Sequence, residues 1–276
     1  MTGAPGGRAA ERPDAVILLH GQPDTSATWA WVRHRLGPLP SGVRLFTPDR
    51  PGYGANPRPG TDFPGNVEEL RRELDRHGVA RAVLVGHSWA GGVALLAAAR
   101  HPQRIAGLLL LASVGPDCLL ARDRVLALPV VGPTIAYVGL GAGARLIAAA
   151  GRRAVGRLPP AERGHARMVL AAQAQHPRPR TFLVEQRALI RQLPLLDGAL
   201  GEIRVPTLVL AGTADMMIPA RTPRLLAERI PGAALRWVNG APHQLPLHAP
   251  GPVVDAIREL LAWPESTPAV AGRPPE

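Results

Sequence analysis

The chain has 276 residues, a length that suits one large α/β domain or one domain with an insertion. Apolar residues make up 46% and charged residues 19%, so the chain can bury a sizeable core and does not have the composition of a disordered protein. Aromatic residues make up only 4%, which is fewer than a base-stacking surface for single-stranded nucleic acid needs.

The formal net charge of +11 comes from 32 basic residues, all of them arginine. These arginines are scattered singly or in pairs, such as Arg71 with Arg72 and Arg152 with Arg153, and form no run of five or six. Nucleic-acid-binding segments concentrate their positive charge. We therefore expect a solvated basic surface and no nucleic-acid partner. Weak association with a membrane surface stays open, and the sequence leaves the oligomeric state undetermined.

The single cysteine, Cys118, cannot form an intramolecular disulfide, which indicates a reducing compartment. Residues 1–14 are polar and rich in Gly and Pro, unlike a secretory signal. Both features predict a cytoplasmic protein. The segment 125–144 carries no charge and approaches the length of about 20 residues that spans a bilayer. Its prolines and glycines argue against a spanning helix, so we expect no stable membrane insertion.

Short apolar runs alternate with helical patterns along most of the chain. The predicted strands are 15–19, 43–46, 82–85, 105–112, 206–211 and 234–238, and the predicted helices are 66–77, 89–100, 219–230 and 253–263. Asn66 with Glu69 resembles a capping box for the first helix. The alternation predicts an α/β fold with a doubly wound, mostly parallel sheet, whose active groups lie beyond the carboxyl ends of the strands.

The alternation breaks between residues 114 and 202. This stretch is rich in Ala, Leu and Arg, shows no clear strand, and contains twelve Arg against six acidic residues. We interpret 114–202 as a helical cap over the carboxyl edge of the sheet. The core would then consist of residues 1–113 and 203–276, with a frayed tail over 264–276.

Ser88 is the first candidate catalytic residue. It lies between a predicted buried strand and a predicted buried helix, in the sequence Gly86-His-Ser-Trp-Ala-Gly91. A sharp strand-to-helix turn there would expose the serine hydroxyl above the sheet. The alternative is a simple helix N-cap.

A serine hydroxyl needs a base, and the base needs an orienting carboxylate. His243 follows the sixth predicted strand and Asp215 follows the fifth, so both are expected at the same sheet edge as Ser88. His248 and Asp117 are the alternatives. His20 is expected to bond loop backbone, and His87 to point away from the site.

The backbone N–H of Trp89 and that of Gln22 are the expected oxyanion donors. Trp89 is also expected to flank the substrate pocket.

These motifs together resemble the α/β-hydrolase superfamily, in particular capped esterases and lipases. Residues 20–23 (HGQP) are similar to the HGxP oxyanion segment and 49–54 (DRPGYG) to the following D-x-x-G-x-G loop. Residues 86–91 match the nucleophile elbow, 212–215 (GTAD) the acid loop and 240–243 (GAPH) the base loop. The resemblance spans about residues 15–261. Ala90 departs from the usual Gly, and the two antiparallel strands that commonly open the fold either are absent or lie upstream.

The resemblance implies a serine hydrolase that cleaves an ester-like bond through an acyl-enzyme. Epoxide hydrolases and haloalkane dehalogenases of the superfamily use Asp as nucleophile and cap Tyr or Trp residues, whereas this chain has Ser88 and a single cap Tyr, Tyr137. A carbon–carbon bond hydrolase, a cofactor-free haloperoxidase and a non-catalytic small-molecule receptor stay open as alternatives.

The uncharged segment 125–144 is predicted to line the substrate pocket, and plain packing within the cap is the alternative. The candidate pocket residues are Leu126, Val130, Ile135 and Tyr137. Such a lining favours an apolar substrate of small to medium size. The sequence shows no metal-ligand spacing and no cofactor motif, so we expect neither a metal nor a cofactor.

Overall fold

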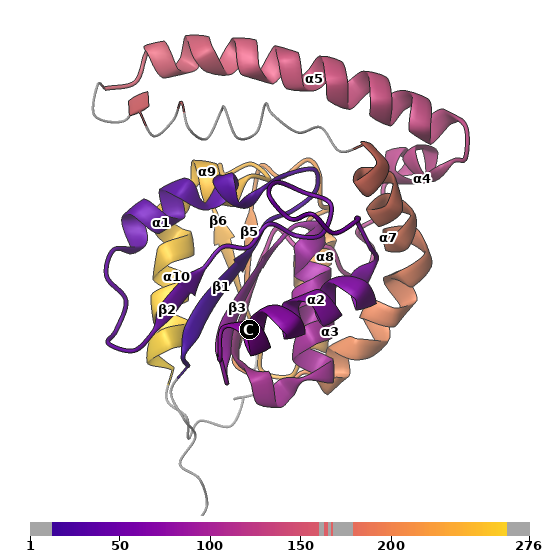
Figure 1. Cartoon of the computed structure of the whole chain (residues 1–276). Helices are drawn as coiled ribbons and strands as arrows, with labels where there is room; N and C mark the ends of the chain where they lie inside the picture. Colours follow the sequence, from indigo (N-terminus) through magenta and orange to yellow (C-terminus); the bar gives the residue numbers. More distant parts are fainter. Residues whose placement is uncertain (1–12, 160–162, 165–166, 168–178, 264–276) are drawn as a thin grey trace, which may run out of the picture.

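The computed structural model describes residues 13–159, 163–164, 167 and 179–263. Within these ranges six strands form one sheet in the order β2-β1-β3-β4-β5-β6, and every neighbouring pair is parallel (Figure 1). The strands are β1 (Ala15–Leu19), β2 (Arg44–Phe46), β3 (Ala82–His87), β4 (Ile105–Leu111), β5 (Thr207–Gly212) and β6 (Ala234–Val238). The predicted α/β fold with a parallel, doubly wound sheet is confirmed.

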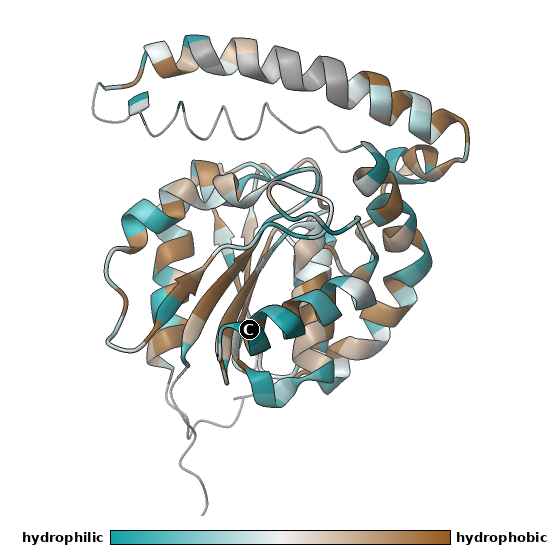
Figure 2. Ribbon diagram, in the orientation of Figure 1, coloured by the Kyte–Doolittle hydropathy of each residue, from teal (hydrophilic) through white to brown (hydrophobic). Residues whose placement is uncertain are grey.

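Helices cover both faces of the sheet, as right-handed crossovers between parallel strands require. On one face lie α2 (Phe63–Arg76), α3 (Trp89–Arg100) and α8 (Arg221–Arg229), and on the other lie α1 (Ala30–Leu36) and α10 (Pro250–Ala262). β1, β3, β4 and β5 are apolar and almost entirely buried, which explains why they read as continuous hydrophobic runs in the sequence (Figure 2).

The strands and helices that position the candidate site agree closely with the sequence prediction. α3, β1 and β6 have the predicted bounds, and the other four predicted strands differ by one or two residues at their ends. α3 is buried over ten of its twelve residues, in agreement with its nearly uniform apolar sequence.

The predicted start of α2 is wrong. The helix begins at Phe63, and the carboxylate of Asp62 caps it by accepting a hydrogen bond from the Gly65 N–H at 3.0 Å. Asn66 is a buried residue inside the helix, and its amide donates to the carbonyls of Thr61 and Asp62. Pro64 in the first turn favours the earlier start, because its missing N–H costs nothing there.

Two helices escaped the sequence prediction. α1 lies between β1 and β2 and buries Val32 and Leu36 against α10. The short α9 (Leu245–His248) follows the predicted base loop. Both are short, of seven and four residues, so a helical period hardly develops in them.

Between β4 and β5 the described part of the chain is helical, with α4 (Ala121–Ala127), α5 (Val131–Gly156) and α7 (Pro179–Ala199). α7 packs along α3, and α5 runs over the edge of the sheet at which the strands end (Figure 1). The glycines and prolines of residues 125–144 therefore do not prevent a 26-residue helix, since Pro133 occupies its first turn. No described helix combines the length and apolarity needed to cross a membrane. Residues 1–12 and the predicted tail 264–276 lie outside the described residues.

Candidate active site

Ser88 occupies a sharp turn between β3 and α3. Its backbone has φ 55° and ψ −121°, a conformation that non-glycine residues rarely adopt. Neighbouring backbone holds this strained turn on both sides, because the Ser88 N–H donates to Leu111 O at 2.9 Å and its carbonyl accepts from Gly91 and Val114. Strain of this kind persists where the surroundings enforce it and is common at catalytic residues.

The turn leaves no room for side chains at two of its positions. A Cβ on Gly86 would lie 2.6 Å from Ala90 O, and a Cβ on Gly91 would lie 1.9 Å from Ser113 Oγ. Ala90, by contrast, is fully buried and its methyl group is accommodated. The departure from the usual elbow pattern at Ala90 is therefore compatible with the turn. The position that must be a glycine is Gly91, because it has no space for a side chain.

His243 joins Ser88 to Asp215. His243 Nε2 lies 2.9 Å from Ser88 Oγ, and His243 Nδ1 lies 2.9 Å from Asp215 Oδ2. The three residues come from loops after β3, β5 and β6, which open at the same edge because these strands are parallel. The side chains of His243 and Asp215 are 14% and 5% exposed, so the pair is sheltered without being sealed from solvent.

Asp215 is held as a carboxylate. Burial raises its pKa, but hydrogen bonds from His243 and from the N–H groups of Ile218 and Met217 outweigh burial and lower the pKa below its usual range. The two backbone donors bind Oδ1 at 3.0 and 2.7 Å, which leaves Oδ2 for the imidazole. An ionised Asp215 favours the tautomer of His243 that carries its proton on Nδ1 and presents Nε2 as an acceptor to Ser88.

The acid loop and the base loop are bound to each other. The Ala214 N–H donates to Ala241 O at 3.0 Å, and the Gly240 N–H donates to Thr213 Oγ1 at 2.8 Å. Gly212 allows this approach, because a Cβ there would lie 2.1 Å from Ala241 O. These contacts between the two loops hold Asp215 and His243 at a fixed distance from each other.

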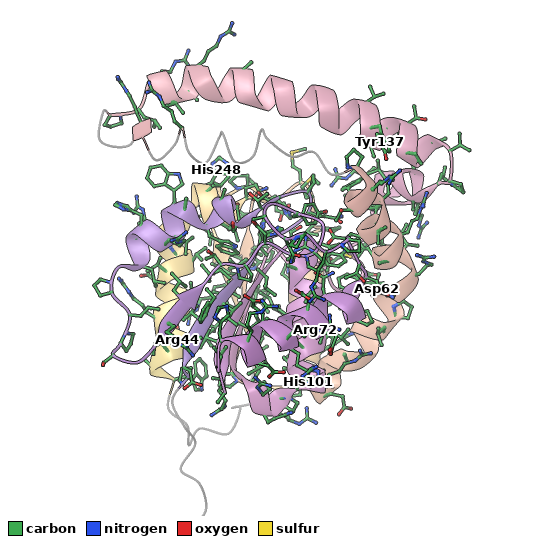
Figure 3. The ribbon with its side chains drawn as sticks, in the orientation of Figure 1. Arg44, Asp62, Arg72, His101, Tyr137 and His248 are labelled. Atoms are coloured by element: carbon green, nitrogen blue, oxygen red, sulfur yellow. The ribbon has the colours of Figure 1, made fainter. Side chains whose placement is uncertain are left out.

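The alternative residues lie elsewhere. His248 is exposed on α9 (Figure 3), and the side chain of Asp117 is 62% exposed and pairs with Arg221. His20 bonds loop backbone as expected: its Nδ1–H donates to Gly21 O at 2.9 Å and its Nε2 accepts from the Arg50 N–H. His87 does not point away from the site, since its Nε2–H donates to the backbone carbonyl of His243 at 3.1 Å.

The two expected oxyanion donors belong to segments that adjoin Ser88. Trp89 follows Ser88 as the first residue of α3. Gln22 follows Gly21, and a Cβ on Gly21 would lie 3.0 Å from Ser88 Cβ. The indole of Trp89 was expected to flank the pocket, but it is fully buried and stacks on Phe63 at 4.1 Å between ring centroids. Its side chain therefore contributes to the core in this structure.

Arg50 and Glu185 are two neighbours of the site that the sequence did not reveal. They form a buried ion pair between the loop after β2 and α7. Arg50 belongs to the 49–54 motif, but nothing local to it indicates a partner 135 residues away.

The predicted pocket residues stay predictions. Leu126 is half-buried, whereas Val130 is 77% exposed and Ile135 and Tyr137 are about half exposed. Tyr137, at the start of α5 (Figure 3), lines a cavity of about 710 Å³ with Arg58, Arg180 and Val184.

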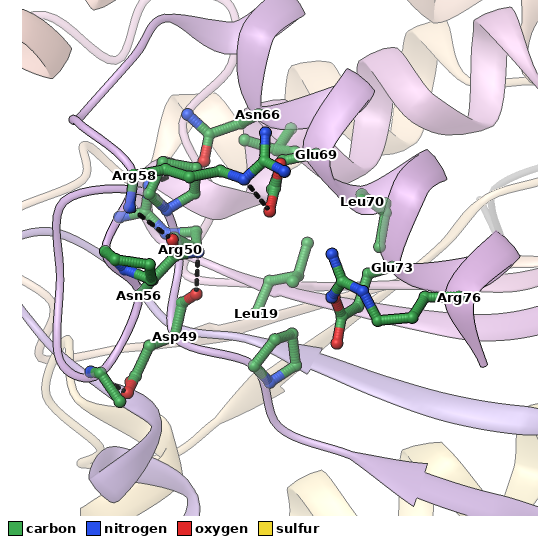
Figure 4. Close-up of a pocket in the computed structure, with 15 residues that line it drawn as sticks. Leu19, Asp49, Arg50, Asn56, Arg58, Asn66, Glu69, Leu70, Glu73 and Arg76 are labelled. Carbon is green, nitrogen blue, oxygen red and sulfur yellow. Dashed lines mark hydrogen bonds and ion pairs between the residues drawn. The ribbon is translucent and has the colours of Figure 1, made fainter.

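A second cavity, of about 430 Å³, lies between the loop after β2 and α2 (Figure 4). Neither cavity includes Ser88, Asp215 or His243 in its walls. Within the described ranges, no group of three or more His, Cys, Asp or Glu side chains has an arrangement that suits a metal.

The family is shown by comparison with known proteins. The model of the alpha/beta hydrolase family matches residues 16–256, and the chain belongs to this family. An uncharacterised protein of Mycobacterium tuberculosis is 26% identical over 92% of this chain and 77% of its own length. Epoxide hydrolase A of the same organism is 29% identical over 89% of each chain.

The solved structure of a thermophilic esterase from Thermogutta terrifontis is similar with a TM-score of 0.67 and 23% identity, and covers 90% of this chain and 89% of that one. At this identity the structural likeness shows the fold alone.

Proposed function

We propose that the protein is a serine hydrolase that cleaves a carboxylic ester through an acyl-enzyme, with Ser88 as nucleophile, His243 as base and Asp215 as orienting acid. One observation supports this most strongly. The Nε2 of His243 lies 2.9 Å from the Ser88 hydroxyl while Nδ1 of the same ring lies 2.9 Å from a carboxylate. This geometry is what proton transfer from a serine hydroxyl requires.

In the acylation step, Ser88 Oγ forms a bond to the ester carbonyl carbon as His243 Nε2 takes the hydroxyl proton. The carbonyl electron pair moves to oxygen, and the N–H groups of Gln22 and Trp89 stabilise that negative charge. The amino-terminal end of α3 adds a favourable field at the same place. Collapse of this intermediate breaks the bond to the alcohol oxygen, which receives the proton from His243, and leaves an acyl group on Ser88.

In the deacylation step, water attacks the acyl carbonyl while His243 Nε2 accepts a proton from it. The bond to Ser88 Oγ then breaks, Oγ regains its proton from His243, and the carboxylic acid leaves. Asp215 stays ionised throughout and stabilises the imidazolium that forms in each step. The lowered pKa of Asp215, which its hydrogen bonds produce against the effect of burial, supports this role.

We further propose that residues 114–202 form a cap that shields the site and limits substrates to small or medium apolar esters. The position of α5 over the ends of the strands supports this (Figure 1). Leu126, Val130, Ile135 and Tyr137 are the candidate contacts, and no cofactor is required for the steps above. Epoxide hydrolysis is disfavoured, because the resemblance assigns those enzymes an Asp where this chain has Ser88.

The test compares wild type, Ser88→Ala and the control Ser26→Ala on a panel of p-nitrophenyl esters of increasing acyl length. We expect turnover in wild type and S26A, with a loss of at least about 10³-fold in S88A. A fluorophosphonate probe should label the first two proteins and leave S88A unlabelled. Unchanged ester turnover in S88A would refute the nucleophile.

A different result would redirect the assignment of the substrate. Labelling of Ser88 by the probe without turnover of any ester would exclude the carboxylic ester and favour the carbon–carbon or haloperoxidase alternative. Absence of both labelling and turnover would favour a non-catalytic receptor.

A further inference from the structure

Arg50 is a buried arginine that binds the backbone of the loop after β1. It is 3% exposed, its Nε donates to His20 O at 2.7 Å, and its Nη2 donates to Gly21 O at 2.9 Å. Two consecutive carbonyls of the candidate oxyanion loop are thus held by one planar guanidinium. Because that group is rigid, it fixes the orientation of both peptides as well as their position.

The second of these carbonyls matters for the oxyanion donor. The Gly21 carbonyl and the Gln22 N–H belong to the same peptide unit, which is planar and trans, so its C=O and N–H point in opposite directions. Holding the oxygen therefore aims the N–H. The Gly21 oxygen accepts a further bond from His20 Nδ1 at 2.9 Å. A positive charge on the oxygen side also polarises the peptide and strengthens its N–H as a donor.

Glu185 on α7 supplies the charge that balances Arg50. It is fully buried, its carboxylate accepts hydrogen bonds from both terminal nitrogens of Arg50, and its Oε2 also accepts from Tyr53 Oη at 2.8 Å. Burial raises the pKa of Glu185, while Arg50 and Tyr53 oppose that rise. An arginine without this partner would be a buried, uncompensated charge next to the oxyanion loop.

The same residue of α7 also supports the second expected oxyanion donor. The backbone carbonyl of Glu185 accepts a hydrogen bond from Trp89 Nε1 at 3.1 Å. The Arg50 guanidinium carbon lies 4.7 Å from the centroid of the Trp89 ring, within the range of a cation–π contact. Glu185 therefore contacts Trp89 directly and Gln22 through Arg50.

We propose that Arg50 and Glu185 are positioning residues of the oxyanion hole, and that the seating of α7 on the core sets the alignment of both oxyanion donors. This inference rests on the proposed serine-hydrolase function. Arg50 and Glu185 do not contact the substrate in this proposal. They act on the reaction through the peptide of Gln22 and the indole of Trp89.

The test uses Glu185→Gln and Arg50→Lys, with Asp197→Asn as a matched control. Asp197 also lies on α7 and pairs with an arginine, Arg229, but both side chains are exposed. Each protein is assayed for kcat and KM on the best p-nitrophenyl ester, with active sites counted by fluorophosphonate titration. A trifluoromethyl ketone serves as the second probe, because Ser88 adds to its carbonyl and leaves an oxyanion in the hole.

Removal of one oxyanion donor costs about 10²–10³ in kcat, so misalignment should cost about 10- to 100-fold. We expect this loss in kcat for E185Q and R50K, with KM changed less than about threefold. The inhibition constant of the ketone should rise by the same factor as kcat/KM falls, whereas D197N should behave as wild type. A purely structural role would lower the unfolding midpoint and leave kcat per titrated site and ketone affinity unchanged, and that result would overturn the proposal.

Two further arms keep the test decisive. If E185Q and R50K do not fold, Tyr53→Phe takes their place, because it removes one donor to Glu185 and no charge. A kcat about threefold lower with parallel loss of ketone affinity supports the proposal, and wild-type values overturn it. Turnover that persists in S88A would refute the hydrolase mechanism itself, whereas an inactive S88A beside a fully active E185Q and R50K would refute the positioning role alone.

Discussion

The ring of His87 lies beside that of His243, with centroids 5.2 Å apart, and donates its Nε2–H to the His243 backbone carbonyl. Burial, together with the neighbouring His243, lowers the pKa of His87 to about 3. The second ring nitrogen, Nδ1, is buried and has no hydrogen-bond partner among the residues that the structure describes, as a neutral imidazole allows. His87 therefore holds the backbone of the proposed base in place and stays uncharged.

This arrangement predicts a specific pH dependence of stability. Histidine in the unfolded chain has a pKa of about 6.5. Below that pH, His87 binds a proton in the unfolded chain but stays neutral in the folded protein. The contribution of His87 to the free energy of unfolding is fully present above about pH 6.5 and falls as the pH drops toward about 3. From pH 7 to pH 5.5 the loss from His87 is about 1 kcal/mol in the free energy of unfolding.

Urea unfolding of wild type and His87→Gln at both pH values measures this difference. Gln keeps an N–H donor and does not titrate, so the variant should lose about 1 kcal/mol less than wild type over the same interval. The comparison between variants isolates His87 from His20, whose pKa burial also lowers. Equal pH dependence of the two proteins would show that folded His87 takes up the proton.

Asp215→Asn should remove most of the activity and little of the stability. The Asn oxygen can still accept the N–H groups of Met217 and Ile218, so the loop keeps its anchor. The amide, however, cannot stabilise an imidazolium and favours the wrong tautomer of His243, which costs about 10⁴ in kcat in comparable triads. Ester kinetics together with an unfolding curve check this. An activity loss below tenfold would indicate that another carboxylate orients His243.

Gly212→Ala should separate the acid loop from the base loop. The added methyl group would lie 2.1 Å from Ala241 O, a backbone atom, so the loop must shift to accept it. We expect a loss of about 1–3 kcal/mol in stability and a larger loss of kcat than of substrate affinity. Gly251→Ala in α10 is the matched control, because its methyl group meets open space. Equal kinetics in the two variants would mean that the loops adjust without moving the triad.

Cys118 should behave as a protected thiol in the native protein. It is 3% exposed, and burial raises its pKa to about 11. At pH 8 a chromogenic disulfide reagent should therefore react far more slowly with the native protein than with the protein unfolded in urea. Because the chain contains one cysteine, the reaction reports on a single position. Rapid native labelling at pH 8 would show that the segment after β4 opens readily.

The features of the fold that depend on local pattern were predictable from the sequence. Buried parallel strands are short apolar runs, and the strict alternation with helices fixed their order, so the strand ends that hold Ser88, Asp215 and His243 could be placed at one edge. The start of α2 was misplaced because Asn66 and Glu69 imitate a capping box, while the actual cap, Asp62, lies two residues before a proline. Local pattern could not rank these two competing caps.

The features that depend on long-range packing were not predictable. Glu185 is one of two acidic residues in a helix that also carries several arginines, and only the packing of α7 on α3 brings it to Arg50. The burial of Trp89 has the same origin, because its ring is enclosed by Phe63, Arg50 and the backbone of α7. The apolar character of residues 125–144 likewise gave no indication that two of their valines are exposed. Val130 lies just before α5 and Val138 lies within it.

The buried carboxylate of Glu185 limits how freely the helical segment between β4 and β5 can be exchanged. A chimera that replaces α7 with a foreign segment leaves Arg50 with no counter-charge from that helix, even when the graft joins the strands without strain. A transplanted segment therefore has to bring an acidic side chain to the same depth, or the recipient has to give up its arginine together with the two loop carbonyls that the arginine binds.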